Sequence, residues 1–352
     1  LLSTAIFNVR FAANFLKIRS PKNLIFRVYL LKPSSNGRVK TNCSLTNMSF
    51  KAHELYQEYE DPNKYKTSTE KKVERALEDA KEEGLGTRKE TVNFQEMKEL
   101  FGKNFLGPEA VEKTFGVPLA EVPEIPFSVE ELERAEKLGQ MLLLRVDKTA
   151  EGKPMSLEAM TNILTKRWKD AGMGELLNSA DGWKSWIGED FFMKEAPRMG
   201  WALVSKDVLP ESLRKNYLEQ TEVIIATLKN EAFKGMDMPE EYEKAIAEFE
   251  FKKDKLAKLM NDDWQKAAKE LLELKITKLT RQTVPETIYD LAMYYDANNE
   301  RLLSDKYTWA ASLSPGGGLV NLGHFDARGV YGYRWPPDDR YGRLGVSLSR
   351  RL

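Results

Sequence analysis

The chain has 352 residues, 54 of them Lys or Arg and 54 Asp or Glu, and 41% are hydrophobic, so it is long and apolar enough to bury a substantial core. The charge is unevenly placed: residues 1–47 hold eight basic and no acidic residues, which leaves 46 basic against 54 acidic residues in the remainder. An acidic body argues against a nucleic-acid-binding protein, and a single cysteine, Cys43, excludes an intrachain disulfide framework or a cysteine-rich zinc site. No run of about 18 apolar residues occurs, so the sequence predicts no membrane span.

Residues 1–47 form a basic leader whose composition is typical of a transit peptide. The first methionine is Met48, where the composition changes, so we expect the leader to be unstructured or not part of the mature protein. Organelle targeting and a basic helix at a membrane surface stay open as alternatives. No secretory signal is evident, and the sequence favours a cytoplasmic protein.

Residues 48–127 are expected to form a charged arm and a connector. The arm mixes both charge signs with few apolar residues, which predicts a solvated helix or a flexible segment. A domain boundary is placed near Phe127, so that the C-terminal domain spans 128–352. The basis is a set of closely spaced prolines that is typical of a connecting segment: Pro108, Pro118, Pro123 and Pro126.

The body of the chain reads as a few strands among helices. Short apolar runs at 141–146 and 200–205 predict buried strands. Apolar residues at helical spacing predict a helix behind Ser156, and the aromatic-acidic run 183–192 is interpreted as core plus a turn.

Two further helices carry capping patterns. The strongest helical signal spans 237–276, where Asp237 and Glu240 are spaced as a capping box and the helix is either continuous or broken near 261–263. We expect this region to pack onto its own domain. Thr283 and Glu286 repeat the capping pattern before a helix that ends near 297–299.

The last 46 residues, 307–352, contain no Lys, Glu, Gln or Met, although the preceding chain is rich in all four. Four short runs, YTWAASL, LVNLGHFD, GVYGYRW and LGVSLS, alternate with glycine- and proline-rich turns and predict short strands. Helices followed by such strands indicate an α+β fold, with a helical body and a C-terminal region of short antiparallel strands.

The composition of this segment is typical of a recognition surface, because aromatic side chains give contact area at low entropic cost. Period-two alternation places Tyr331, Tyr333 and Trp335 on one strand face. The alternative is that the three rings belong to the core. Leu344, Val346 and Leu348 alternate likewise and are predicted to be buried.

His324 and Asp326 are expected on one face as a polar pair. A catalytic dyad would need a nucleophile and an orienting group, and the sequence supplies no candidate for either. The PGGGL run lacks the lysine and helix of a phosphate loop, and the only other histidine is His53 in the charged arm. No cofactor and no metal site are therefore predicted.

The C-terminal segment resembles the variable region of diversity-generating retroelement target proteins. The resemblance rests on the start Trp309 to Ser312, the glycine-spaced strands and the closing LGVSLSR at 344–350. It implies a C-type-lectin-like domain of the formylglycine-generating-enzyme type in 128–352, with a helical insertion and a variable segment 307–352. In that family adenine-directed mutagenesis rewrites exposed, asparagine-type codons, which cannot yield Lys, Glu, Gln or Met.

The resemblance implies a non-enzymatic protein that binds an unknown protein or surface ligand through the C-terminal sheet, in an oligomeric state that stays open. Formylglycine-generating enzymes depend on cysteines that this segment lacks, so oxidase activity is not expected. Two other interpretations are a hydrolase-type enzyme using carboxylates or the polar pair, and an intracellular scaffold assembled through the helix at 237–276. The implied ligand-binding positions are Asn321, His324, Asp326, Tyr331, Tyr333, Trp335, Asp339 and Tyr341.

Overall fold

The computed structural model describes residues 93–179 and 182–351, which lie within one compact unit of α+β fold. The leader and the charged arm predicted before Asn93 lie outside the described residues. Two four-stranded sheets organise the unit, one in the order β1-β2-β3-β8 and the other in the order β6-β5-β4-β7. Their strands are β1 (Phe105–Leu106), β2 (Gln140–Arg145), β3 (Gly200–Ser205), β4 (Tyr307–Leu313), β5 (Leu319–Asp326), β6 (Gly329–Trp335), β7 (Leu344–Gly345) and β8 (Ser349–Arg350).

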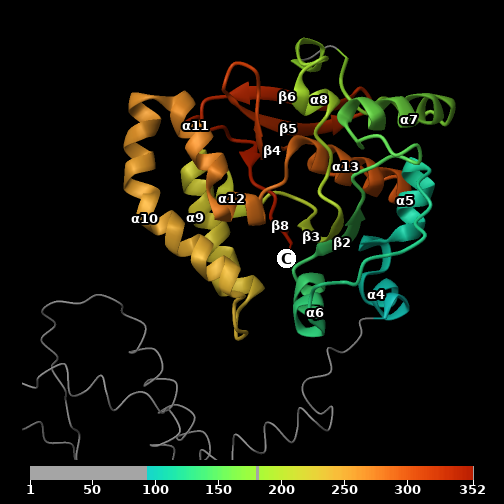
Figure 1. Ribbon diagram of the computed structural model, residues 1–352, viewed down its shortest axis with the longest axis horizontal. Coiled ribbons are helices and arrows are strands. Elements are labelled where there is room, and N and C mark those ends of the chain that lie inside the picture. The colour runs from blue at the N-terminus through green and yellow to red at the C-terminus, as the bar shows by residue number, and fades with distance from the viewer. Residues whose placement is uncertain (1–92, 180–181, 352) are drawn as a thin grey trace, which may run out of the picture. The chain divides into compact units, whose positions relative to one another are not determined.

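Helices surround the two sheets (Figure 1). Short 3-10 turns at Gly102–Asn104, Gly182–Ser185 and Pro210–Ser212 and a π turn at Leu228–Ala232 complete the elements. The α-helices are α4 (Phe94–Phe101), α5 (Pro108–Phe115), α6 (Val129–Lys137), α7 (Leu157–Asp170), α8 (Asp190–Met193), α9 (Tyr217–Thr227), α10 (Glu240–Asp262), α11 (Trp264–Glu273), α12 (Lys275–Thr280) and α13 (Val284–Asn298).

Helix α13 is the centre of the fold and packs against β2 and β4. The Thr283 side chain accepts from the Glu286 N–H, and the Glu286 carboxylate accepts from the Thr283 N–H, which is the capping box expected from the sequence. Asn299 ends the helix in the left-handed conformation with φ 54°. Because α13 is buried on nearly every side, its polar residues need partners inside the protein.

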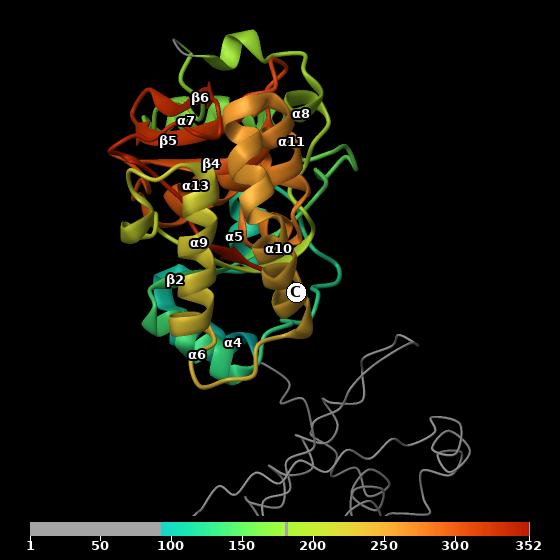
Figure 2. The same ribbon diagram turned by 90° about the vertical axis from the view of Figure 1, so that its left-hand side faces the viewer.

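Helices α9 to α12 form a second, smaller core beside the sheets, and Figures 1 and 2 show them standing together on one side. Their apolar faces enclose Trp309, Leu319 and Leu344 from the second sheet. The prediction that the region 237–276 packs onto its own domain is confirmed, because Tyr242, Phe249 and other residues of α10 are buried in this core.

Helix α10 nevertheless begins later than predicted. Its N-cap is Pro239, without a side-chain cap, so the expected box of Asp237 with Glu240 is not the start of the helix. The helical region is broken at Asp263, whose carboxylate accepts from the Lys266 N–H at 3.0 Å and so begins α11.

The structure also corrects the boundary expected near Phe127. Residues 94–127 bury side chains such as Phe101, Val111 and Ile125 in the same core as the rest of the unit. Pro108 occupies the first turn of α5, where a missing N–H costs nothing, rather than a connector.

Strands β3, β4, β5 and β6 match their predicted ranges, but LGVSLS is not one strand. It crosses from β7 in one sheet to β8 in the other. Between them the Val346 N–H donates to Ser212 Oγ at 2.9 Å and the Ser347 N–H donates to Thr308 Oγ1 at 3.0 Å. Side-chain oxygens therefore accept these backbone N–H groups in place of a neighbouring strand. Leu344, Val346 and Leu348 are buried, as predicted.

None of the helices in the described part of the chain has both the length and the apolar character needed to cross a bilayer.

Candidate functional site

A continuous row of rings lies on one face of the second sheet, and we call it the aromatic face. Neighbouring ring centroids are 5.0 to 6.4 Å apart, with both stacked and edge-on pairs. Most of the rings are partly exposed, and Tyr341 is 42% exposed. The members are Tyr307, His324, Tyr331, Tyr333, Trp335 and Tyr341.

Strand β6 supplies the middle of the aromatic face. Tyr331, Tyr333 and Trp335 alternate along it with Gly332 and Arg334, and they lie on one face as the period-two pattern predicts. All three are half-buried, whereas Gly332 faces the other way against the Trp183 ring, where an added Cβ would lie 2.6 Å from a ring atom. The rings therefore extend from a packed sheet without being enclosed by it.

The loop after β6 holds Tyr341 in place beside Trp335. The Tyr217 N–H donates to the Pro337 carbonyl at 3.0 Å, and Arg340 forms two hydrogen bonds with the Glu219 carboxylate at 2.8 and 3.1 Å. The hydrogen bonds from Arg340 lower the pKa of Glu219 although burial opposes the shift. This loop is thus anchored to the first turn of α9.

Asp339 lies in the same loop and is half-buried. Its N–H donates to the Pro336 carbonyl at 3.2 Å. Burial raises the pKa of its carboxyl, and the neighbouring Asp338 adds to the rise.

Asn321 differs from the exposed position that the sequence implied, because its side chain is completely buried. It is the register partner of Trp309 on β4 and of Tyr333 on β6, so it lies on the floor of the aromatic face. Both its amide atoms lack a hydrogen-bond partner, as do Trp309 Nε1 and His324 Nδ1. A buried polar group without a partner costs about 1–3 kcal/mol, so these groups destabilise the folded chain unless a partner is supplied.

No hydrogen bond between His324 and Asp326 is seen among the described residues, although His324 is near enough for its charge to help lower the pKa of Asp326. A β-bulge between Gly323 and Asp326 shifts the register, and His324 has φ 47°. The bulge needs glycine at 323, because an added Cβ would lie 2.1 Å from the Lys306 carbonyl oxygen. The His324 ring lies instead between the rings of Tyr307 and Tyr331.

Asp326 pairs with Arg328. Its carboxylate accepts from the Arg328 N–H at 2.8 Å and from the guanidinium at 2.9 and 3.1 Å. Burial opposes ionisation, but these hydrogen bonds lower the pKa of Asp326. The Arg328 guanidinium also lies 5.4 Å from the centroid of the Tyr331 ring, which makes it a rim residue of the aromatic face.

The left-handed backbone at His324 restricts which residues fit there. We expect His324→Asn and His324→Gly to leave the free energy of unfolding nearly unchanged, because both residues tolerate positive φ. His324→Val should lower it by about 1–2 kcal/mol, since a β-branched residue is strained in this conformation. Urea unfolding of the three variants measures the difference, and equal stabilities would contradict the strain argument.

Sequence reasoning missed Tyr307 and Arg328. Tyr307 begins β4, and its Cα partner is Gly323 at the bulge, which brings its ring between His324 and Tyr333. Tyr307 precedes Trp309 by two residues, so the alternation of side chains along a strand could have placed both rings on one face. Arg328 is part of a two-residue turn, and nothing in the sequence placed its side chain over a ring.

Metal ligation has no candidate in the described residues: they contain no group of three or more His, Cys, Asp or Glu placed to hold an ion. A pocket of about 300 Å³ lies between α4, β1 and the start of α5. It is lined by Phe94, Phe105 and Gly107, among others, and by none of the predicted site residues.

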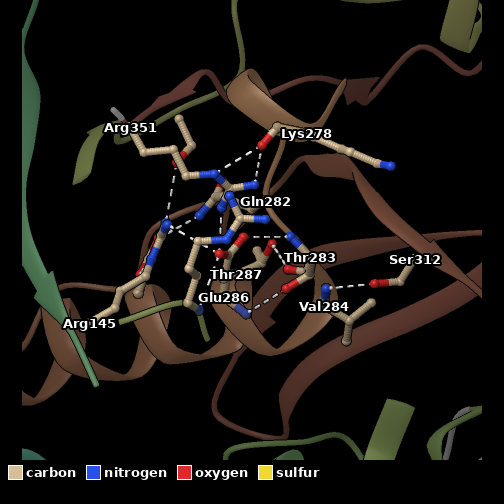
Figure 3. Close-up of polar contacts among 12 residues, drawn as sticks. Arg145, Lys278, Gln282, Thr283, Val284, Glu286, Thr287, Ser312 and Arg351 are labelled. Carbon is tan, nitrogen blue, oxygen red and sulfur yellow. Dashed lines mark hydrogen bonds and ion pairs between the residues drawn. The ribbon is translucent and has the colours of Figure 1, made fainter. Parts of the chain in front are cut away.

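A second polar cluster is fully buried where α13 meets β2 and the C-terminal strand (Figure 3). The Arg145 guanidinium donates to both carboxylate oxygens of Asp290, one at 2.9 Å, and to Ser349 Oγ at 3.3 Å. Arg351 donates to the Glu286 carboxylate at 2.5 Å and to the Lys278 carbonyl. The cluster joins residues from distant parts of the chain.

The charge of Glu286 makes this cluster sensitive to acid. Burial alone would raise the pKa of Glu286, but the guanidiniums of Arg145 and Arg351 lower it from 4.5 to about 2. A folded-state pKa below the unfolded value contributes stability above pH 4.5 that is lost as the pH falls through about 2.

Glu286→Gln isolates this contribution, because glutamine still completes the capping box. We expect the variant to lose on the order of 3 kcal/mol of unfolding free energy at neutral pH and to show a flatter pH dependence below pH 4.5. Urea unfolding at several pH values measures both. If the unfolding free energies of the wild type and the variant depend on pH in the same way, the ionised Glu286 carboxylate does not contribute to stability.

Comparisons with known proteins find no protein-family model, no curated protein and no solved structure that matches the chain.

Proposed function

We propose that the protein is a non-enzymatic ligand-binding protein and that the aromatic face is its recognition surface. The proposal is based on the six connected rings of the aromatic face, most of which are half-exposed. The opposite face of the same sheet is packed into the core. Rigid aromatic groups of this kind act as anchors in protein interfaces, and paired charges at the rim exclude water around them. The partner would be a protein or a surface ligand.

The proposal extends to a diversity-generating retroelement target with a C-type-lectin-like domain. The distribution of exposure supports it. Tyr331, Tyr333 and Tyr341 reach solvent, and exchange of partly exposed side chains costs less stability than exchange of fully buried ones. Leu344 and Val346 are fully buried and would be the constant framework.

A hydrolase using His324 and Asp326 receives no support from the geometry, because Asp326 is committed to Arg328 and the His324 ring is stacked among tyrosines. For assembly through α10, the apolar side of the helix is buried in its own domain, and Phe251 is its one large apolar side chain that is highly exposed among the described residues.

A tolerance experiment tests the proposed function. The codons for Tyr331, Tyr333 and Tyr341 are randomised in one surface-displayed library, and those for Leu344, Val346 and Leu348 in a second. We expect most members of the first library and few of the second to be displayed and resistant to protease. Equal losses in both libraries would show that the aromatic face belongs to the core, and the proposal would fail.

A further inference from the structure

The floor of the aromatic face is polar but uncharged. Asn321 lies at its centre, with Trp309 and Tyr333 directly opposite on the two neighbouring strands, so all three side chains lie on one face of the sheet. The two amide atoms of Asn321 and the indole N–H of Trp309 are buried without hydrogen-bond partners. Nearly all buried polar groups in native proteins have a hydrogen-bond partner. Unpaired groups beneath the half-buried rings of the aromatic face therefore indicate that a bound ligand supplies the partner.

The charges near the aromatic face limit which chemical groups a ligand can place beside Asn321. Asp326 is paired with Arg328 at one end of the face, and Arg340 is paired with Glu219 at the other. The register partners of Asn321 are Trp309 and Tyr333, so an ion buried beside it would lose its hydration without meeting an opposite charge there, which disfavours carboxylate, phosphate and ammonium groups at this position. A neutral amide suits the position, because its C=O accepts from Asn321 Nδ2 while its N–H donates to Oδ1.

The spacing of the rings indicates the form of the ligand. Tyr331, Tyr333 and Trp335 recur every second residue along β6, an interval of about 6.6 Å. A polypeptide in extended conformation presents its side chains to one side at the same interval. Alternate ligand side chains would then fit between successive rings, with a backbone amide above the floor. A ligand that displaces the half-buried Tyr333 ring would reach Asn321.

We propose that the aromatic face binds an uncharged stretch of extended polypeptide and that Asn321 pairs with one of its backbone amides. This inference rests on the proposed function of the face. It adds the class of ligand and makes Asn321 a specificity-determining residue.

Asn321→Leu is the direct test, because leucine has nearly the same size and removes both unpaired groups. A phage-displayed library of random peptides is selected on the wild-type protein, and the enriched peptides are titrated against both proteins. We expect enriched peptides with few charges that bind Asn321→Leu at least tenfold more weakly, while the melting temperature of the variant is equal or higher. If the leucine variant does not fold, Asn321→Ala replaces it in the titration.

The possible results separate this inference from the proposed function. Enriched peptides that bind the wild type and Asn321→Leu equally would overturn the amide contact and leave the face as a binding surface. Peptides that keep their affinity for a Tyr331→Ala/Tyr333→Ala variant would bind elsewhere and contradict the proposed function itself. Failure to enrich any peptide contradicts the inference, and binding of immobilised oligosaccharides instead would preserve the face with another class of ligand.

Discussion

Asp290→Ala is expected to lower the free energy of unfolding by about 3–5 kcal/mol. Asp290 accepts two hydrogen bonds from the buried Arg145 guanidinium and a third from Gln282 at 2.6 Å. Its removal leaves a buried guanidinium that keeps the Ser349 hydroxyl at 3.3 Å and faces the Glu286 carboxylate at 3.7 Å. An uncompensated buried charge is among the most destabilising changes a single substitution can make.

A matched control comes from an exposed ion pair. Asp190 and Lys194 are joined at 2.7 Å, with 79% and 72% of their side chains exposed, so Asp190→Ala should cost no more than about 1 kcal/mol. Urea unfolding of both variants gives the comparison. A loss below 1 kcal/mol for Asp290→Ala would show that the buried cluster adds nothing to the stability of the fold.

Tyr331→Ala/Tyr333→Ala is expected to weaken ligand binding by about 2 kcal/mol or more, roughly thirtyfold. The two rings are central to the aromatic face and only half-buried, so truncation removes contact area from the ligand and limited packing from the protein. The variant should lose about 1–2 kcal/mol of stability and still unfold cooperatively. Titration with peptides selected on the wild type measures the affinity, and thermal unfolding measures the stability.

Phe251→Ala is the control for this experiment. Phe251 is 89% exposed on α10, away from the second sheet, so its truncation should change neither affinity nor stability by more than about 0.5 kcal/mol. If the tyrosine variant does not fold, the rings are part of the core. If it folds and binds as tightly as Phe251→Ala, the ligand contacts another surface.

Local patterns were sufficient to predict many elements. Alternation of rings and glycines located β6, and the capping box of Thr283 with Glu286 located the start of α13. Both signals act over a few residues, so the sequence reveals them without knowledge of the tertiary structure.

Features that depend on distant residues could not be predicted. The split of LGVSLS into β7 and β8 depends on Ser212 and Thr308, which supply the partners of Val346 and Ser347. The burial of Asn321 likewise depends on the strands to either side of it. The pairing of Arg145 with Asp290 joins positions 145 residues apart in the chain.

The candidate site also combines features that local patterns predict with features that they do not. The common face of Tyr331, Tyr333 and Trp335 follows from their spacing. The position of His324 does not, because a bulge at Gly323 shifts the register and the His324 ring lies beside those of Tyr307 and Tyr331. A single-residue shift of register is enough to place successive side chains on opposite faces, so polar pairs inferred from strand spacing are vulnerable to bulges.

Sequencing the encoding locus in many isolates tests whether the aromatic face is a diversified recognition surface. We expect a near-copy template of the C-terminal coding segment, a nearby reverse-transcriptase gene, and substitutions at adenines under His324, Tyr331, Tyr333 and Tyr341 that spare Leu344. An invariant C-terminal segment without a template would contradict this proposal and leave an ordinary α+β domain.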